Sequence, residues 1–113
     1  MKVKDIVPRL GLDMLSGDAD REISGCYVGD LLSWVMSHAQ FDECWITIMS
    51  NINVVAVASL TDVACVIIAE GARPEENVIE AAKAKGVCLL LSEETVFSLA
   101  AEMAGLLKEK QAE

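Results

Sequence analysis

The chain has 113 residues, of which 53% are hydrophobic and only 4% aromatic, so we expect one domain with a mostly aliphatic core. Its 18 Asp and Glu residues outnumber its 9 Lys and Arg residues, and the resulting net charge of −9 excludes nucleic acid and anionic membranes as favoured partners. Polar residues interrupt every apolar run before the roughly 20 residues that a membrane-spanning helix needs, and "MKVKDIVPRL" lacks the apolar centre of a signal peptide, so we expect a cytoplasmic protein with no membrane partner.

The segment before Asp20 predicts a short helix or turn and then a brief strand around Leu12–Leu15, although Pro8 interrupts the helical pattern. Beyond this segment, short β-prone runs recur at intervals of about 20 residues. These runs are Glu22–Val28, Trp45–Met49, Val63–Ala69 and Val87–Leu91. The last two are apolar almost throughout, which is typical of strands that are covered on both faces.

Three of the intervening stretches have the start and stop signals of helices. Asp30 is placed to cap the first helix, whose expected apolar face consists of Leu31, Leu32, Val35, Met36 and Ala39. Pro74 fits the first position of the second helix, which Gly86 ends. Ser92 is placed to cap the last helix, and we expect residues 108–113 to form a frayed tail.

The stretch Ile52–Leu60, "INVVAVASL", allows two interpretations. Its valines favour a strand, which would form a hairpin through "SNIN". As a helix it would begin after Ser50 or Asn51, and it would connect the two flanking strands by a crossover, which parallel strands require. We therefore favour the helix.

Alternating strands and helices predict an α/β fold, with a mostly parallel sheet of about 4–5 strands flanked by helices. The pattern contains no linker or low-complexity segment, and we expect residues 1–113 to form a single domain with its core over about residues 3–107.

The four cysteines are spread along the chain rather than paired in a C-x-x-C motif. They occur within the apolar stretches "SGCYVG", "ECWITI", "ACVIIA" and "VCLLL". Free cysteine is often buried as a small hydrophobic residue, whereas zinc ligands usually come in close pairs. We therefore expect buried thiols, no metal site and no cofactor.

Three turns follow the first three repeated runs, and they would meet at one edge of a parallel sheet, where small ligands often bind. Their polar and glycine residues form a candidate ligand-binding set: Asp30, Ser50, Asn51, Asn53, Gly71 and Arg73. Arg73 would receive an anionic group, although neighbouring glutamates oppose one. The alternative is that these residues only cap helices. No combination of nucleophile, base and metal ligands is visible, so we expect no catalytic residues.

The segments "GCYVGDLL", "WITIMSNIN" and "VIIAEGARP" resemble the strand and turn motifs of the DRTGG domain family. The resemblance covers roughly residues 3 to 107, with Glu70–Gly71 at a turn where members usually carry two glycines. It implies an α/β fold similar to the N-terminal domains of bacterial HPr kinase/phosphorylase and of some Mur ligases. It also implies an accessory role, like that of DRTGG domains that accompany CBS domains in family II pyrophosphatases. A phosphate-binding G-x-x-x-x-G-K-[ST] loop is absent from the sequence, so a kinase activity is not expected.

We therefore interpret the protein as a non-catalytic regulatory module that acts by self-association, most simply as a homodimer, or through a partner protein. Trp34 is a candidate contact residue, because it lies off the leucine face of its helix. The alternative is a sensor that binds a small anionic metabolite or nucleotide at the carboxyl edge of the sheet.

Overall fold

Five helices and five strands make up the part of the chain that the structure, a computed structural model, describes, residues 1–112. In chain order they are α1 (Val3–Leu10), β1 (Asp13–Met14), β2 (Gly25–Val28), α2 (Leu32–His38), β3 (Glu43–Thr47), α3 (Ile52–Thr61), β4 (Cys65–Ile68), α4 (Glu76–Lys85), β5 (Leu89–Leu91) and α5 (Val96–Ala112). None of the described helices combines the length and the apolar character needed to cross a membrane.

The strands form one sheet in the order β1-β5-β4-β3-β2. The four strands β2 to β5 run parallel, and each pairs with its neighbour in the sequence. Only β1 is antiparallel, with Asp13 opposite Leu91 at the edge of the sheet. The predicted α/β fold with a mostly parallel sheet is confirmed.

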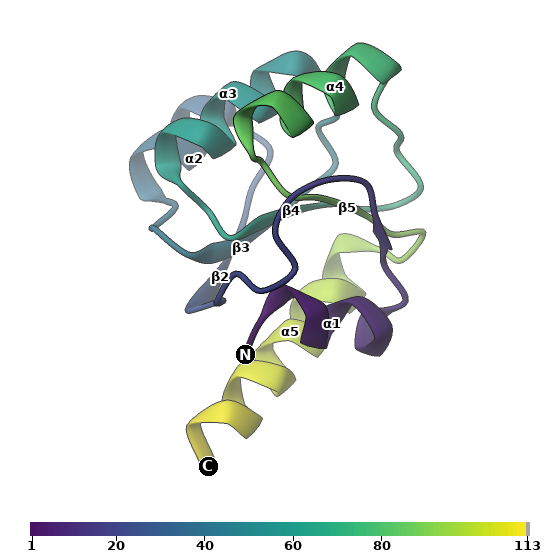
Figure 1. Cartoon of the computed structure of the whole chain (residues 1–113). Coiled ribbons are helices and arrows are strands. Elements are labelled where there is room, and N and C mark those ends of the chain that lie inside the picture. Colours follow the sequence, from purple (N-terminus) through teal and green to yellow (C-terminus); the bar gives the residue numbers. More distant parts are fainter. Residues whose placement is uncertain (113) are drawn as a thin grey trace.

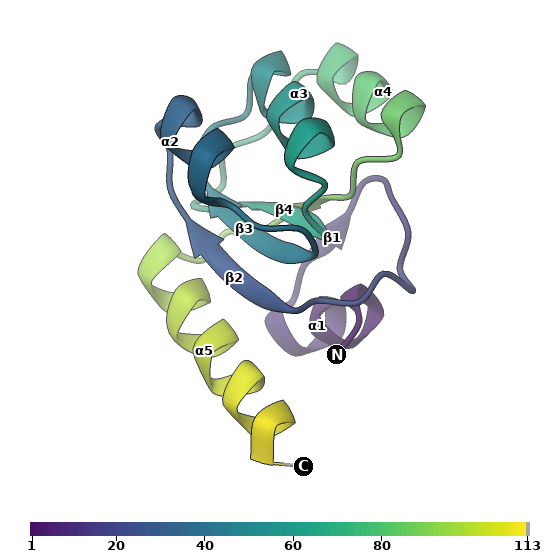
Figure 2. The same ribbon diagram turned by 90° about the vertical axis from the view of Figure 1, so that its left-hand side faces the viewer.

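The helices lie in two layers. Helices α2, α3 and α4 cover one face of the sheet, and α1 and α5 cover the other (Figures 1 and 2). This follows from the strand order, because right-handed crossovers between successive parallel neighbours all pass over the same face. The stretch Ile52–Leu60 is one of these crossovers, so its prediction as a helix is confirmed.

A hydrophobic core fills each side of the sheet. Along β3, Cys44 and Ile46 face the core beneath α1 and α5, whereas Trp45 faces the core beneath α2, α3 and α4. Successive residues of a strand point to opposite faces, and a strand covered on both faces must therefore be apolar at every position. This accounts for the uninterrupted apolar runs of the sequence.

The predicted starts of two helices are wrong. Helix α4 begins at Glu76 rather than Pro74, because the chain first has to pass from the end of β4 to the layer that contains α2, α3 and α4. Ser92 does not cap α5; its Oγ accepts a bond from Glu94 N, while Thr95 Oγ1 accepts one from Ser98 N in the first turn of the helix. Gly86 ends α4 with a left-handed φ of 70°, as predicted.

The predicted frayed tail also differs from the structure, because α5 continues to Ala112. Two ion pairs tie this end of the helix to the rest of the molecule: Arg9 Nη2 lies 3.1 Å from Glu109 Oε2, and Lys110 Nζ lies 3.8 Å from Glu22 Oε2. Residue 113, the last of the predicted tail, lies outside the described residues.

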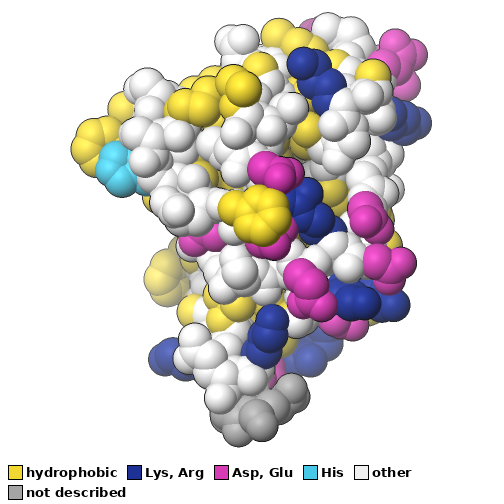
Figure 3. All heavy atoms as spheres, turned by 60° about the vertical axis from the view of Figure 1, so that its left-hand side comes forward, with side chains coloured by type: hydrophobic (Ala, Val, Ile, Leu, Met, Phe, Trp, Pro, Cys, Tyr) yellow, Lys and Arg dark blue, Asp and Glu magenta, His cyan; other side chains and the backbone are white. Residues whose placement is uncertain are grey.

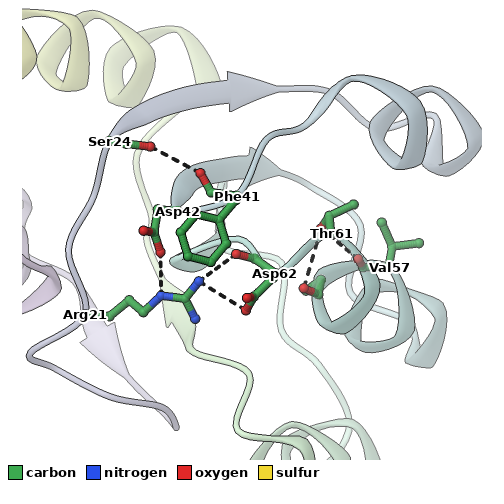
Figure 4. A network of polar contacts seen from close by, with 8 residues as sticks. Arg21, Ser24, Phe41, Asp42, Val57, Thr61 and Asp62 are labelled. Carbon is green, nitrogen blue, oxygen red and sulfur yellow. Dashed lines mark hydrogen bonds and ion pairs between the residues drawn. The ribbon is translucent and has the colours of Figure 1, made fainter.

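Arg21 joins the loops at the amino edge of the sheet (Figure 4). Its Nε donates to Asp42 Oδ1 over 2.7 Å, and its Nη2 donates to the carbonyl oxygen of Asp62 over 2.6 Å. Both aspartates have left-handed backbone angles, with φ of 65° and 55°, at the turns that precede β3 and β4. The guanidinium also lies 5.3 Å from the centre of the Phe41 ring. Arg21 therefore holds two strained turns in place.

Candidate functional site

The loops that follow β2, β3, β4 and β5 meet at the carboxyl edge of the sheet, because these strands are parallel. The three turns selected from the sequence therefore share one edge, as expected. The structure nevertheless distributes their six candidate residues among different surroundings.

Asp30 has a structural role at this edge. Its Oδ1 accepts hydrogen bonds from Thr47 Oγ1 over 2.8 Å and from Ile48 N over 3.0 Å. It thereby ties the loop after β2 to the end of β3. The N-cap of α2 is Leu31, which makes no side-chain capping bond, so the prediction that Asp30 caps this helix is wrong. Its carboxylate bonds instead to the hydroxyl of Thr47, 17 residues away in the sequence.

Ser50, Asn51 and Arg73 come together around one surface groove of about 360 Å³. The groove is also lined by Ile52, Glu75, Asn77 and Val78. Asn51 Oδ1 is occupied as the cap of α3, where it accepts a bond from Asn53 N over 2.9 Å. Residues that carry hydroxyl, amide and guanidinium groups, from the loops after β3 and β4, thus line one depression, which is the arrangement expected of a polar ligand site.

Charge in this groove is mixed. Arg73 is exposed and makes no ion pair among the described residues, so its guanidinium is available to an anion. Glu75 lines the same groove and would repel that anion unless the ligand lies on the Arg73 side. Sequence reasoning missed Asn77 as a lining residue, although its place in the first turn of a helix at this edge was a usable signal.

Gly71 lies in a different and much smaller cavity. It lines a space of about 40 Å³ between the loops after β4 and β5, together with Gly11, Asp13, Ser92 and Glu93. Arg73 also borders this space. A cavity of this volume has room for about one or two waters but not for a metabolite. Gly71 is therefore a residue of the turn rather than of the groove.

The turn at Glu70–Gly71 is fixed by its neighbours. Both residues have left-handed φ angles, 60° and 74°. Glu70 N donates to Glu94 O over 2.8 Å, and Gly71 N donates to Ser92 O over 2.9 Å. The Glu70 carboxylate accepts a bond from Val96 N at the start of α5 over 3.3 Å. The glutamate at this position therefore caps a helix, a role that a second glycine could not fill.

Asn53 faces a third depression, which lies between α2 and α3. The candidate set thus divides into one polar groove with Ser50, Asn51 and Arg73, and three residues with other surroundings. The division could not be read from the sequence, because it depends on how the crossover helices pack.

The cysteines form a row across the sheet. Cys26, Cys44 and Cys65 are in register on β2, β3 and β4, and all four thiols are free. A hydrogen bond with Cys44 lowers the pKa of Cys26, whereas hydrogen bonds with Cys26 and Cys65, together with burial, raise the pKa of Cys44. Burial raises the pKa of Cys88 to about 12. Among the described residues no cluster of three or more His, Cys, Asp or Glu side chains is arranged to hold a metal ion.

Comparison with known proteins identifies a family and a similar fold. The family model for the DRTGG domain matches residues 5–106. A crystal structure of the CBS and DRTGG domains of the regulatory region of Clostridium perfringens pyrophosphatase, complexed with the activator diadenosine tetraphosphate, is similar with a TM-score of 0.73 at 14% identity. This likeness covers 90% of the present chain and 45% of the other, and it shows the fold alone. No curated protein gives a significant match, and the likeness to HPr kinase/phosphorylase stays a prediction.

Proposed function

Because this chain belongs to the DRTGG domain family, we propose that it is a non-catalytic regulatory module that acts by assembling with itself or with a partner protein. One observation carries the proposal. Nine large hydrophobic side chains are exposed in the described part of the chain, and eight of them lie between Val28 and Leu60. Soluble monomers rarely expose clustered apolar side chains, and such clusters commonly mark contact surfaces.

A regulatory role is supported by the setting of the similar structure. There, a DRTGG domain occurs with CBS domains in the regulatory region of a pyrophosphatase. The present chain spans less than half of that chain. We therefore infer a regulatory role for it, and not the activity of the pyrophosphatase.

Self-assembly is tested by measuring molar mass in solution. We expect light scattering coupled to size-exclusion chromatography to give twice the chain mass of 12.2 kDa, with dissociation on dilution. A mass of 12.2 kDa that persists at tens of micromolar protein would contradict self-association.

A second candidate function is the sensing of a small anionic metabolite or nucleotide. The groove that brings together Ser50, Asn51 and the unpaired guanidinium of Arg73 favours it. The nucleotide in the similar structure adds support, because that molecule is also an activator with several phosphates.

The sensing function is tested by a thermal-shift screen of nucleotides and phosphorylated metabolites, with diadenosine tetraphosphate included. We expect Arg73→Ala to abolish the shift produced by a ligand and Asn51→Ala to weaken it. Lys83→Ala is the matched control, because it removes one exposed cation at the opposite end of α4. Asn51→Ala also removes a helix cap, so the quantity compared is the ligand-induced shift and not the melting temperature of the free protein. A shift that survives both groove substitutions excludes this groove.

A further inference from the structure

The outer side of α2 and α3, here called the α2–α3 face, carries almost no charge. Charged residues make up 24% of the chain, yet between Asp30 and Asp62 only Asp42 and Glu43 are charged, and both lie outside the two helices. Figure 3 shows hydrophobic and uncharged polar side chains over α2 and α3 at its upper left, whereas basic and acidic side chains gather below and to the right. In a protein of net charge −9 this face is the region where close approach meets least repulsion.

Helix α3 has the composition of a buried helix. Its ten residues, "INVVAVASLT", include no charged side chain, and a helix that is apolar around most of its circumference normally lies inside a protein. The structure buries only one side of it. Ile52 is 46% and Leu60 is 73% exposed, and Ala56 is exposed between them.

Helix α2 shows the same mismatch. Of its predicted apolar face only Val35 is buried, whereas Leu31 is 66% and Met36 is 40% exposed. A groove of about 460 Å³ runs between the two helices, and it is lined by Leu32, Ser33, Met36, Asn53, Ala56 and Val57. Each wall contains one small side chain, Ser33 on α2 and Ala56 on α3, and neither wall carries a charge, so this groove has the shape and polarity to receive an apolar ridge from another helix.

We propose that the α2–α3 face binds the α2–α3 face of a second copy of this chain, with an apolar helix ridge of each copy in the groove of the other. The proposal rests on the self-assembly proposed above and names its surface. The occupant has to present an apolar, uncharged face with helical ridges, and this chain has such a face itself. A twofold contact of this kind is isologous, so one face supplies both the ridge and the groove.

The available area fits a stable dimer. Five large side chains remain about half exposed here, and together with the small exposed residues between them they offer an area on the order of the roughly 800 Å² that a standard interface buries per partner. The five are Leu31, Trp34, Met36, Ile52 and Leu60, which are between 40% and 73% exposed. Trp34 thus belongs to the contact at its outer border, where its ring stacks on His38 with 4.4 Å between centroids.

The proposal is tested by placing a carboxylate at the middle of the face. Ala56→Glu introduces it at an exposed helical position where glutamate is well tolerated, and Leu60→Glu is a second variant, at 73% exposure. The control is Phe97→Glu, which makes the same change of charge on α5, on the opposite face of the sheet, at a residue that is 83% exposed. Circular dichroism melts confirm that each variant folds.

We expect sedimentation equilibrium to show a dimer for the wild type and for Phe97→Glu. In Ala56→Glu and Leu60→Glu the dimer dissociation constant should rise by about 100-fold or more, because like charges would face each other across the interface. A dimer that persists in both α2–α3 variants, or is lost equally in Phe97→Glu, overturns the proposed surface while self-assembly stands. A monomeric wild type overturns both.

Salt dependence gives an independent readout on the unmodified protein. An interface without charges between two chains of net charge −9 should hold or strengthen as salt screens their repulsion. Dissociation on raising salt would show that ion pairs hold the dimer and would overturn the proposal.

Discussion

Replacing Arg21 with alanine should destabilise the fold far more than the loss of an ordinary surface cation. The Arg21 side chain is only 26% exposed, and its guanidinium bonds to the carboxylate of Asp42, whose side chain is 21% exposed, and to the carbonyl and carboxylate of Asp62. Removing it leaves a half-buried carboxylate without its partner and releases two turns with left-handed backbone angles. Lys4, by contrast, pairs with Asp20 where both side chains are more than half exposed.

The magnitude follows from these contacts. A hydrogen bond to a charged group contributes about 1.5–3 kcal/mol net, and the lower end applies to the Asp42 bond because the site is partly exposed. The contact with the more exposed Asp62 adds about 0.5–1 kcal/mol. Arg21→Ala should therefore lower the free energy of unfolding by about 2–3 kcal/mol, and Lys4→Ala, which breaks a fully exposed ion pair, should change it far less.

Urea unfolding measures both changes at one protein concentration, because the proposed dimerisation would make apparent stability depend on concentration. With a urea dependence of about 1–3 kcal/mol per molar, the midpoint of Arg21→Ala should fall by on the order of 1 M. Arg21→Lys should recover only part of the loss, since a single ammonium cannot reach both partners as the planar guanidinium does. A value for Arg21→Ala within about 0.5 kcal/mol of wild type, or equal to that of Lys4→Ala, would refute the reasoning.

Three further changes probe other parts of the molecule. Gly17→Ala should prevent folding or cost more than about 3 kcal/mol in urea unfolding, because its added Cβ would lie 2.3 Å from the Cβ of Cys88. Gly86→Ala is the control: its added Cβ would meet nothing within 4 Å, so it should cost only the roughly 1–2 kcal/mol of a left-handed backbone. Mass spectrometry after treatment with an alkylating agent should find one adduct, on the partly exposed Cys26, in the native protein and four in denaturant. Stability should fall as pH rises from the ordinary thiol pKa of 9.0 towards the pKa of about 12 of the buried Cys88, since only the unfolded thiol ionises in this range. Cys88 alone should contribute about 2 kcal/mol of this fall near pH 10.5, and urea unfolding of Cys88→Ala at about pH 8 and pH 10.5 should show a smaller difference than wild type.

The fold was predictable because its signals are local. Uninterrupted apolar runs identified the central strands, and the need for crossovers decided that Ile52–Leu60 is a helix. Cap residues were harder to assign, because polar side chains have several partners within reach. Asp30 bonds to Thr47 instead of to its own helix, and Thr95 rather than Ser92 caps α5. The bond of Asp30 joins residues 17 apart in the sequence and could not be read from the local pattern, whereas Ser92 and Thr95 are competing caps within one short segment.

The sequence was enough to predict where the candidate site lies, but not which of the candidate residues line the same groove. Parallel strands were enough to place the three turns at one edge, but Gly71 faces the loop after β5 and Asn53 faces α2. These outcomes depend on all three crossover helices packing on one face, a property of the whole sheet. The same packing explains why the predicted apolar face of α2 is largely exposed. Val35 is its one fully buried residue, Leu32 and Ala39 pack against the core only in part, and Leu31 and Met36 are exposed.

The first turn of α3 connects the two proposed binding surfaces. Asn51 and Ile52 line the polar groove, and Asn53 and Ala56 line the groove that would receive a second copy. A ligand that orders this turn changes the surface presented to the other copy, and a dimer that orders it changes the affinity for the ligand. Linkage requires the two effects to be equal in free energy. A regulatory domain can transmit a signal in this way, since the only change it needs is in how tightly two copies associate. The groove variant Arg73→Ala should then leave the dimer of the free protein unchanged and abolish only the effect of ligand on the dimer dissociation constant, which sedimentation equilibrium with and without ligand would measure.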